Sequence, residues 1–285
     1  MSAPVRVGTA TAPDGAVLSW RADGSGGTAL VACNGIGVSS FFWRPFARHF
    51  AGTHTFVTWD YRGHGQSPVP AHPEDMTVSQ CARDLWTVAG AAGFSRAVLL
   101  GHSMGTQVIL EAYRLHPSRA QALVPMLGAA GKVMPPMPIL SALIEVGAKN
   151  AGPAARAMRA VLQLPGVWEA ARALRIVHPD LCPREAFEPY VEHLRQLDLR
   201  GYFALARDLL THDASGLLEQ VRAPTLVIAG ERDLFIPAAR SREMASRIRG
   251  AELLVVREGS HAALVEQPEL VALTLEKFLR LHLLA

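Results

Sequence analysis

The chain has 285 residues, of which 49% are hydrophobic and 19% are charged, so it has ample apolar surface to bury and is not expected to be disordered. Its 28 basic and 25 acidic residues nearly balance, which gives little reason to expect electrostatic binding to nucleic acid. No run of about 18 uncharged apolar residues occurs, so no membrane insertion is expected.

Strand-like and helix-like segments alternate over the first 127 residues. Near the start, a turn at Pro13-Asp14-Gly15 separates two strand-like segments. The later strands are short apolar or β-branched runs, and in the helices apolar residues recur at about every third or fourth position. Strands are predicted at 5–11, 16–21, 29–33, 54–59, 97–100 and 122–127, and helices at 41–50, 78–92 and 106–115. This alternation is typical of a parallel sheet with helices on both faces.

The alternation is interrupted from about residue 131 to 213, where helical segments and prolines occur but no convincing strand. It resumes with a strand at 224–229, a helix at 238–248, a strand at 253–256 and a long helix after Pro268. The sequence therefore predicts an α/β fold with a mostly parallel central sheet of about eight strands flanked by helices. The predicted division is an α/β core made of residues 1–130 and 214–285, with a helical cap inserted at 131–213.

A nucleophile motif follows the predicted strand 97–100. Gly101-His102-Ser103-Met104-Gly105 matches the pattern Gly-x-Ser-x-Gly, a sharp strand-to-helix turn that exposes the serine hydroxyl above a sheet. The glycines are needed because a Cβ would collide within such a turn. A match of five residues can occur by chance, and a glycine-rich turn with an incidental serine is the alternative. The predicted strand before the motif and helix after it favour Ser103 as a nucleophile.

A serine hydroxyl is a weak nucleophile unless a base takes its proton. Of the eleven histidines, His261 follows the late strand 253–256 and is the predicted general base. The acid that orients the imidazole is expected after the preceding strand, where Asp233 is the first choice and Glu231 the alternative.

A tetrahedral intermediate also needs hydrogen-bond donors for its oxyanion. The backbone N–H of Met104, directly after the nucleophile, is the first predicted donor. The second is the N–H of Ile36, in the loop after the strand 29–33. Gly35 in this loop allows the backbone to approach a bound substrate closely, so we expect it to contact substrate. The alternative is that the loop's glycines serve turn geometry only.

Taken together, these segments resemble the α/β-hydrolase fold superfamily over nearly the whole chain. In that superfamily the triad residues follow the order of Ser103, Asp233 and His261. The chain is similar in particular to capped carboxylesterases and lactonases, including enol-lactonase-like and cofactor-free haloperoxidase-like relatives. The resemblance rests on Asn34-Gly35, the segment 60–67, the motif at Ser103, 230–233 with Pro237, and Gly259-Ser260-His261.

The resemblance implies a serine hydrolase that cleaves a carboxylic ester or lactone through an acyl-enzyme. No metal or organic cofactor is expected, because the sequence has no cluster of ligand residues. An aspartate nucleophile, as in haloalkane dehalogenases and epoxide hydrolases of this fold, is disfavoured by Ser103. One departure is Asn34, because many relatives have histidine at this position before the glycine. An asparagine amide can still brace the loop.

The substrate is expected to be small and to have an apolar acyl or alcohol part. The segment 133–140 at the start of the insertion is apolar, and Met137 and Leu140 are predicted to line the pocket. Packing of the insertion on the core explains the same residues equally well. The alternatives are an acyltransferase or thioesterase with the same triad, or a non-catalytic ligand-binding protein on this fold.

A different class of protein is suggested by a degraded dinucleotide-binding pattern. Gly35-Ile36-Gly37 follows a predicted strand, and Asp60 ends the next one, as in nicotinamide-dependent oxidoreductases. Ser40 replaces the third glycine, and two strands precede the unit, so this interpretation is disfavoured. The other interpretation is that Asp60 and Arg62 fix a glycine-rich turn.

The three cysteines are odd in number and widely spaced, so they match neither a disulfide framework nor a zinc site. Together with an N-terminus that lacks an apolar segment of the signal-peptide type, they predict a cytoplasmic protein. The oligomeric state is left open.

Overall fold

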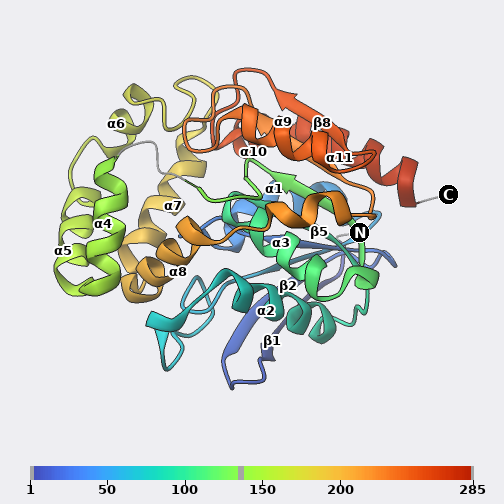
Figure 1. Ribbon diagram of the computed structural model, residues 1–285, viewed down its shortest axis with the longest axis horizontal. Helices are drawn as coiled ribbons and strands as arrows, with labels where there is room; N and C mark the ends of the chain where they lie inside the picture. Colours follow the sequence, from blue (N-terminus) through green and yellow to red (C-terminus); the bar gives the residue numbers. More distant parts are fainter. Residues whose placement is uncertain (1–2, 134–137, 284–285) are drawn as a thin grey trace.

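The sheet has eight strands and is mostly parallel, as predicted (Figure 1). The computed structural model describes residues 3–133 and 138–283, without the side chains of residues 138–140. The strand order is β1-β2-β4-β3-β5-β6-β7-β8, and only the pairs β1–β2 and β2–β4 are antiparallel. The strands are β1 Val5–Thr11, β2 Val17–Asp23, β3 Ala29–Cys33, β4 Thr55–Trp59, β5 Ala97–His102, β6 Ala120–Met126, β7 Leu226–Gly230 and β8 Glu252–Val256.

Each predicted strand is present, with ends that shift by no more than two residues. The central strands β3, β4 and β5 are buried along their whole length, which explains why they appear in the sequence as short runs of mostly apolar and β-branched residues. Side chains on β5 alternate between the two faces: Leu99 joins one hydrophobic cluster, whereas Val98 and Leu100 join the other.

Helices cover both faces of the sheet. The cluster that contains Leu99 is completed by α2, α3 and α9, and the opposite cluster by α1 and α11. These helices are α1 Arg44–Phe50, α2 Val78–Ala91, α3 Met104–Leu115, α9 Ala238–Arg247 and α11 Pro268–Leu283, with the short α10 Ala263–Glu266 and the 3-10 turns η1 Ser40–Trp43, η2 Pro73–Asp75, η3 Pro117–Arg119 and η4 Ser215–Gln220. Within the described ranges no helix has the length and apolarity needed to cross a membrane.

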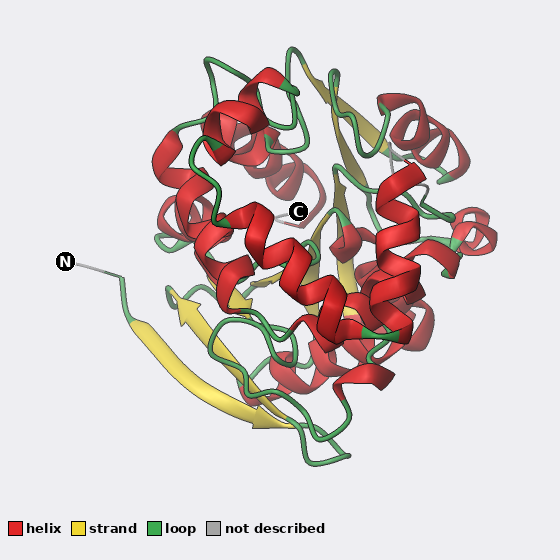
Figure 2. Cartoon of the chain, turned by 90° about the vertical axis from the view of Figure 1, so that its left-hand side faces the viewer, coloured by secondary structure: helices red, strands yellow, loops and turns green. Residues whose placement is uncertain are grey.

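Five further helices lie between β6 and β7, where the sequence predicts an insertion. They are α4 Pro138–Lys149, α5 Ala151–Leu162, α6 Val167–Ala173, α7 Arg184–Gln196 and α8 Leu199–Thr211. Figure 1 shows them gathered at one side of the molecule, and Figure 2 looks onto that side, with strands of the sheet behind the helices. They pack on one another through two hydrophobic clusters of their own, and Ala262 and Val265 of the core contact one of these. The helices are thereby attached beside His261.

Candidate active site

Ser103 lies in a strained turn between β5 and α3, with φ of 54° and ψ of −118°. Two glycines make this turn sterically possible. A Cβ on Gly101 would lie 2.3 Å from the carbonyl oxygen of Gly105, and a Cβ on Gly105 would lie 2.5 Å from that of Cys33. Larger residues would therefore force the turn open and displace the serine hydroxyl from its position above the sheet.

Three predicted site residues form one hydrogen-bonded chain. The Nε2 atom of His261 lies 2.9 Å from Ser103 Oγ, and its Nδ1 atom lies 2.8 Å from Asp233 Oδ2. Because an ionised carboxylate only accepts hydrogen bonds, Nδ1 carries the ring proton and Nε2 accepts from the serine hydroxyl. The residues come from turns after β5, β7 and β8, which are the carboxyl ends of parallel strands.

The orienting carboxylate is itself held by the backbone. Asp233 Oδ1 accepts hydrogen bonds from the N–H groups of Phe235 at 2.8 Å and Ile236 at 2.9 Å, and its side chain is fully buried. The alternative acid, Glu231, instead accepts from the N–H of Glu258. The structure therefore brings Asp233, and not Glu231, to the imidazole of His261.

His102 braces the opposite side of the histidine loop. Its Nε2 atom lies 3.1 Å from the carbonyl oxygen of His261, and Phe42 packs on its ring with centroids 4.6 Å apart. Burial, and to a smaller extent the neighbouring His261, lower the pKa of His102 to about 3. The ring is therefore neutral and donates its Nε2–H to that carbonyl.

Glu266, which the sequence analysis did not single out, joins the His261 loop to the inserted helices. Its buried carboxylate accepts hydrogen bonds from the N–H of Ser260 at 2.9 Å, from the Ser260 hydroxyl at 2.5 Å, and from the N–H of His178 at 2.7 Å. His178 lies between α6 and α7. The sequence marked Glu266 only as an acidic residue in the apolar stretch directly after His261, and this pattern does not identify His178 as its partner.

Two buried neutral histidines predict acid sensitivity of the fold. Burial lowers the pKa of His102 to about 3 and that of His64 to about 4, whereas an unfolded chain binds these protons with a pKa near 6.5. Between the folded and the unfolded pKa values the unfolded state therefore binds more protons than the folded state. The stabilisation is complete above the unfolded pKa and is lost as the pH falls below it toward the folded pKa. Between pH 7 and pH 5 the free energy of unfolding should fall by about 2–4 kcal/mol from this pair.

Urea unfolding at the two pH values measures this change. His64→Gln should reduce the fall by about half, whatever its own effect on stability at pH 7. An unchanged pH dependence in that variant would show that His64 is not the source.

The predicted oxyanion loop is braced by Asn34. Its side-chain amide donates to the carbonyl oxygen of Trp59 at 2.9 Å and accepts from the indole of Trp43 at 2.9 Å. The loop passes close to the nucleophile, because a Cβ on Gly35 would lie 3.2 Å from Ser103 Cβ. Ile36 follows in this loop, and Met104 is the first residue of α3, where N–H groups have no partner within the helix.

The segment 60–67 has a structural role. The Asp60 carboxylate accepts from the N–H of Ser40 at 2.7 Å and the N–H of Gln66 at 3.0 Å, so both of its oxygens are occupied within the protein. The buried Arg62 pairs with Asp84 at 2.6 Å. These contacts support the turn-fixing interpretation of Asp60 and Arg62.

A cavity of about 230 Å³ borders Ser103 and His261. Of the residues predicted to bind substrate, Gly35 lines it, as does the predicted oxyanion residue Ile36. Met137 lies outside the described residues, and Leu140 lies in α4 with its side chain outside the description. The described lining has no Asp, Glu, Lys or Arg; its members include Val38, Phe42, Val133, Ile144, Ile176, Val177, Phe187, Tyr190, Tyr202, Ala206, Leu209, Leu210, Phe235, Ile236, Ala262 and Val265.

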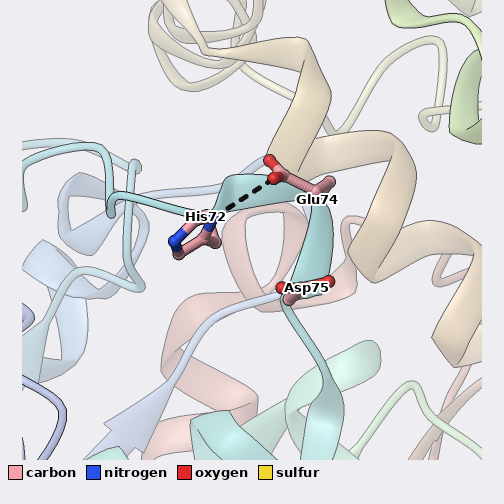
Figure 3. A group of neighbouring side chains, drawn as sticks. All are labelled: His72, Glu74 and Asp75. Carbon is pink, nitrogen blue, oxygen red and sulfur yellow. Dashed lines mark hydrogen bonds and ion pairs between the residues drawn. The ribbon is translucent and has the colours of Figure 1, made fainter.

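One group of potential metal ligands occurs among the described residues. His72, Glu74 and Asp75 lie on and beside the turn η2, with ligand atoms within 4.8 Å of one another (Figure 3). All three side chains are exposed, and none lines the cavity. Figure 3 shows the contact between His72 and Glu74, in which His72 Nδ1 lies 3.4 Å from Glu74 Oε1. Such exposed groups are common on protein surfaces without a metal, so the group adds nothing to the chemistry at Ser103.

Comparisons with known proteins agree with the fold. A family model described as alpha/beta hydrolase fold matches residues 28–268. A protein of Pseudomonas savastanoi pv. phaseolicola named "Putative carbamate hydrolase RutD" is 30% identical over 254 residues, which cover 88% of this chain and 93% of that protein. The structure of a hydrolase from Pseudomonas aeruginosa PA01 is 27% identical with a TM-score of 0.72, covering 96% of this chain and 98% of that one. The enol-lactonase from Burkholderia xenovorans LB400 shares the fold at 23% identity with a TM-score of 0.75, covering 93% of this chain and 96% of that one.

Proposed function

The chain belongs to the alpha/beta hydrolase fold family and is a hydrolase, and on that premise we propose that it is a serine hydrolase that cleaves a neutral carboxylic ester or lactone with an apolar acyl or alcohol part. One observation carries the proposal. The hydrogen-bonded chain from Ser103 through His261 to Asp233 borders a cavity whose described lining has no charged side chain.

The proposed reaction proceeds in two steps through an acyl-enzyme. His261 Nε2 takes the Ser103 proton as Oγ attacks the substrate carbonyl, and the N–H groups of Met104 and Ile36 stabilise the oxyanion. His261 then gives its proton to the leaving alcohol, and the C–O bond to that alcohol breaks. A water molecule activated by His261 next attacks the acyl-enzyme and releases the acid. Asp233 keeps Nδ1 protonated and stabilises the imidazolium in both steps.

The lining of the cavity supports a neutral substrate. Burying a charged group without a partner is costly, and no cation or anion is available in the described lining. Each buried methylene of the substrate can contribute about 0.8 kcal/mol of binding. We further propose that residues 131–213 act as a cap on a core made of 1–130 and 214–285, because α7 and α8 supply lining residues of the cavity that borders Ser103.

A carbamate is the second candidate substrate, because a relative that is 30% identical is named as a carbamate hydrolase. A carbamate ester presents the same kind of carbonyl to Ser103 and needs the same oxyanion donors. Thioester cleavage and acyl transfer to an alcohol or amine would use the same acyl-enzyme, and only the leaving group or the acceptor would differ.

A substrate panel tests the proposal. We expect kcat/KM for p-nitrophenyl esters to rise with acyl length from two carbons until the cavity is filled, and neutral lactones to be preferred over charged ones. Thioesters, carbamate esters and added alcohol acceptors belong in the same panel and discriminate among the candidates. Leu210→Ala, which enlarges the cavity, should move the optimum to longer chains.

Two further variants and one control complete this panel. Met137→Ala and Leu140→Ala test the pocket residues predicted from sequence. Val161→Ala changes an exposed position of α5 and should leave the optimum in place. A flat chain-length profile that the Leu210 variant does not move, or a preference for charged substrates, would contradict the apolar-pocket assignment.

A further inference from the structure

The chain has four tyrosines, and they divide into two pairs. Tyr61 donates its hydroxyl hydrogen to the carbonyl oxygen of Asn34 at 2.8 Å, and the Tyr113 hydroxyl accepts from the N–H of Arg222 at 2.9 Å. Tyr190 of α7 and Tyr202 of α8 line the cavity instead. Neither of these two hydroxyls makes a hydrogen bond to another described residue. Neither hydroxyl oxygen is fully shielded from solvent. Both oxygens are therefore accessible to solvent, and both residues line the cavity.

Both tyrosines line the cavity that borders Ser103 and His261. The ring of Tyr202 packs on the oxyanion loop, because a Cβ on Gly37 would lie 3.1 Å from Tyr202 Cε2. Tyr190 packs beside Phe187, with ring centroids 6.3 Å apart, and Phe187 lines the same cavity. The two phenols are thus held by packing on α7 and α8 while their oxygens have no partner among the described residues.

The charge state of the two phenols is fixed by their surroundings. Burial raises the pKa of Tyr190 and of Tyr202, and the nearby Tyr202 raises that of Tyr190 further. Each hydroxyl is therefore neutral, with one hydrogen to donate and lone pairs that can accept. Away from the catalytic groups, the rest of the described cavity lining is mostly apolar. A substrate that forms hydrogen bonds with these hydroxyls should therefore bind more tightly, because leaving a polar group without a hydrogen bond in an apolar site is costly.

We infer that Tyr190 and Tyr202 form a second polar subsite, which binds an uncharged oxygen-bearing group in a part of the substrate other than the scissile ester or lactone. The inference rests on the proposed function and narrows its substrate class. The substrate is an apolar ester or lactone that also carries a ketone, hydroxyl, ether or amide oxygen. A carboxylate at this subsite is disfavoured, because the described lining offers no Lys or Arg to pair with it.

Matched ester pairs test the subsite. We would compare p-nitrophenyl octanoate with its 5-oxo, 6-oxo and 7-oxo derivatives, each corrected for its rate of hydrolysis by hydroxide. In the unmodified protein, at least one oxo ester should exceed octanoate in kcat/KM by about fivefold to tenfold, as expected for one net hydrogen bond. In the double variant Tyr190→Phe/Tyr202→Phe, which keeps both rings, that ratio should fall to about one or below.

The matched control is Tyr113→Phe, which removes a phenol hydroxyl outside the cavity and should leave the ratio unchanged. The inference is overturned if the unmodified protein shows no preference for any oxo ester, or if the double variant retains the preference.

A second readout separates this inference from the proposed function. Binding of 2-octanone, measured as an increase in melting temperature in a Ser103→Ala background, needs no turnover. If the two phenylalanine substitutions abolish ketone binding, the subsite is supported even when no ester is cleaved. A lack of ester cleavage would refute only the proposed function. Ketone binding that the substitutions leave unchanged, or no ketone binding at all, counts against the subsite.

Discussion

Replacing Ser103 by alanine should lower kcat/KM for a p-nitrophenyl ester by on the order of 10⁴-fold or more. The reason is that the variant loses the atom that forms the acyl-enzyme, and His261 Nε2 loses the hydroxyl that lies 2.9 Å away. The fold should be preserved, because alanine keeps the Cβ of the strained turn at φ 54° and removes only the hydroxyl. Steady-state kinetics and a melting curve measure the two effects separately.

A fluorophosphonate probe provides a test that does not depend on knowing the substrate. The probe should label the unmodified protein at Ser103, as shown by peptide mass spectrometry, and should not label the Ser103→Ala variant. Ser246→Ala, at an exposed serine of α9, is the matched control and should be labelled normally. Full esterase activity in a folded Ser103→Ala protein would refute the proposed mechanism.

The sheet could be predicted from the sequence because strands that are buried on both faces consist mostly of apolar residues. The strands β3 and β5 are fully buried, and β3 and the first four residues of β5 are uniformly apolar, so short runs of this kind are easy to find. One predicted helix was less regular than expected. The helix predicted at 41–50 is divided into the 3-10 turn η1 and the helix α1, whose first turn contains Pro45.

The predicted catalytic residues were found through chain order, and this works because each follows a strand. Parallel strands end at the same edge of the sheet, so residues far apart in sequence, such as Ser103 and His261, meet there. The structure also explains why the motif has glycines, since a Cβ at Gly101 or Gly105 would collide with nearby backbone atoms.

The cavity could not be derived in the same way. Its lining residues Phe187, Tyr190 and Tyr202 lie on α7 and α8, roughly 85 to 100 residues after Ser103 along the chain. Their amphipathic pattern indicates helices but not which face of each helix turns toward Ser103, because that is set by how the helices pack on one another and on the core. The joining role of Glu266 likewise depends on a contact with His178 that no local pattern reveals.

The Asp233→Asn substitution should lower kcat by at least about 10²-fold. Asp233 Oδ1 accepts from two backbone N–H groups, so an asparagine would place its amide oxygen there and its NH₂ group against His261 Nδ1. That amide donates instead of accepting, which favours the imidazole tautomer with its hydrogen on Nε2. In this tautomer the ring cannot accept the Ser103 proton, so the nucleophile is not activated.

Glu231→Gln is the matched control, because it makes the same acid-to-amide change two residues away. The Glu231 carboxylate accepts only from the N–H of Glu258 among the described residues, and a glutamine oxygen can accept the same bond. We therefore expect kcat of this variant to remain within about twofold of the unmodified protein, as is usual for substitutions away from the reacting groups. Melting curves of both variants should show that the folds are intact. If Glu231→Gln proved the more damaging change, Asp233 would not be the acid that orients His261, and the assignment of the triad would have to be revised at that residue.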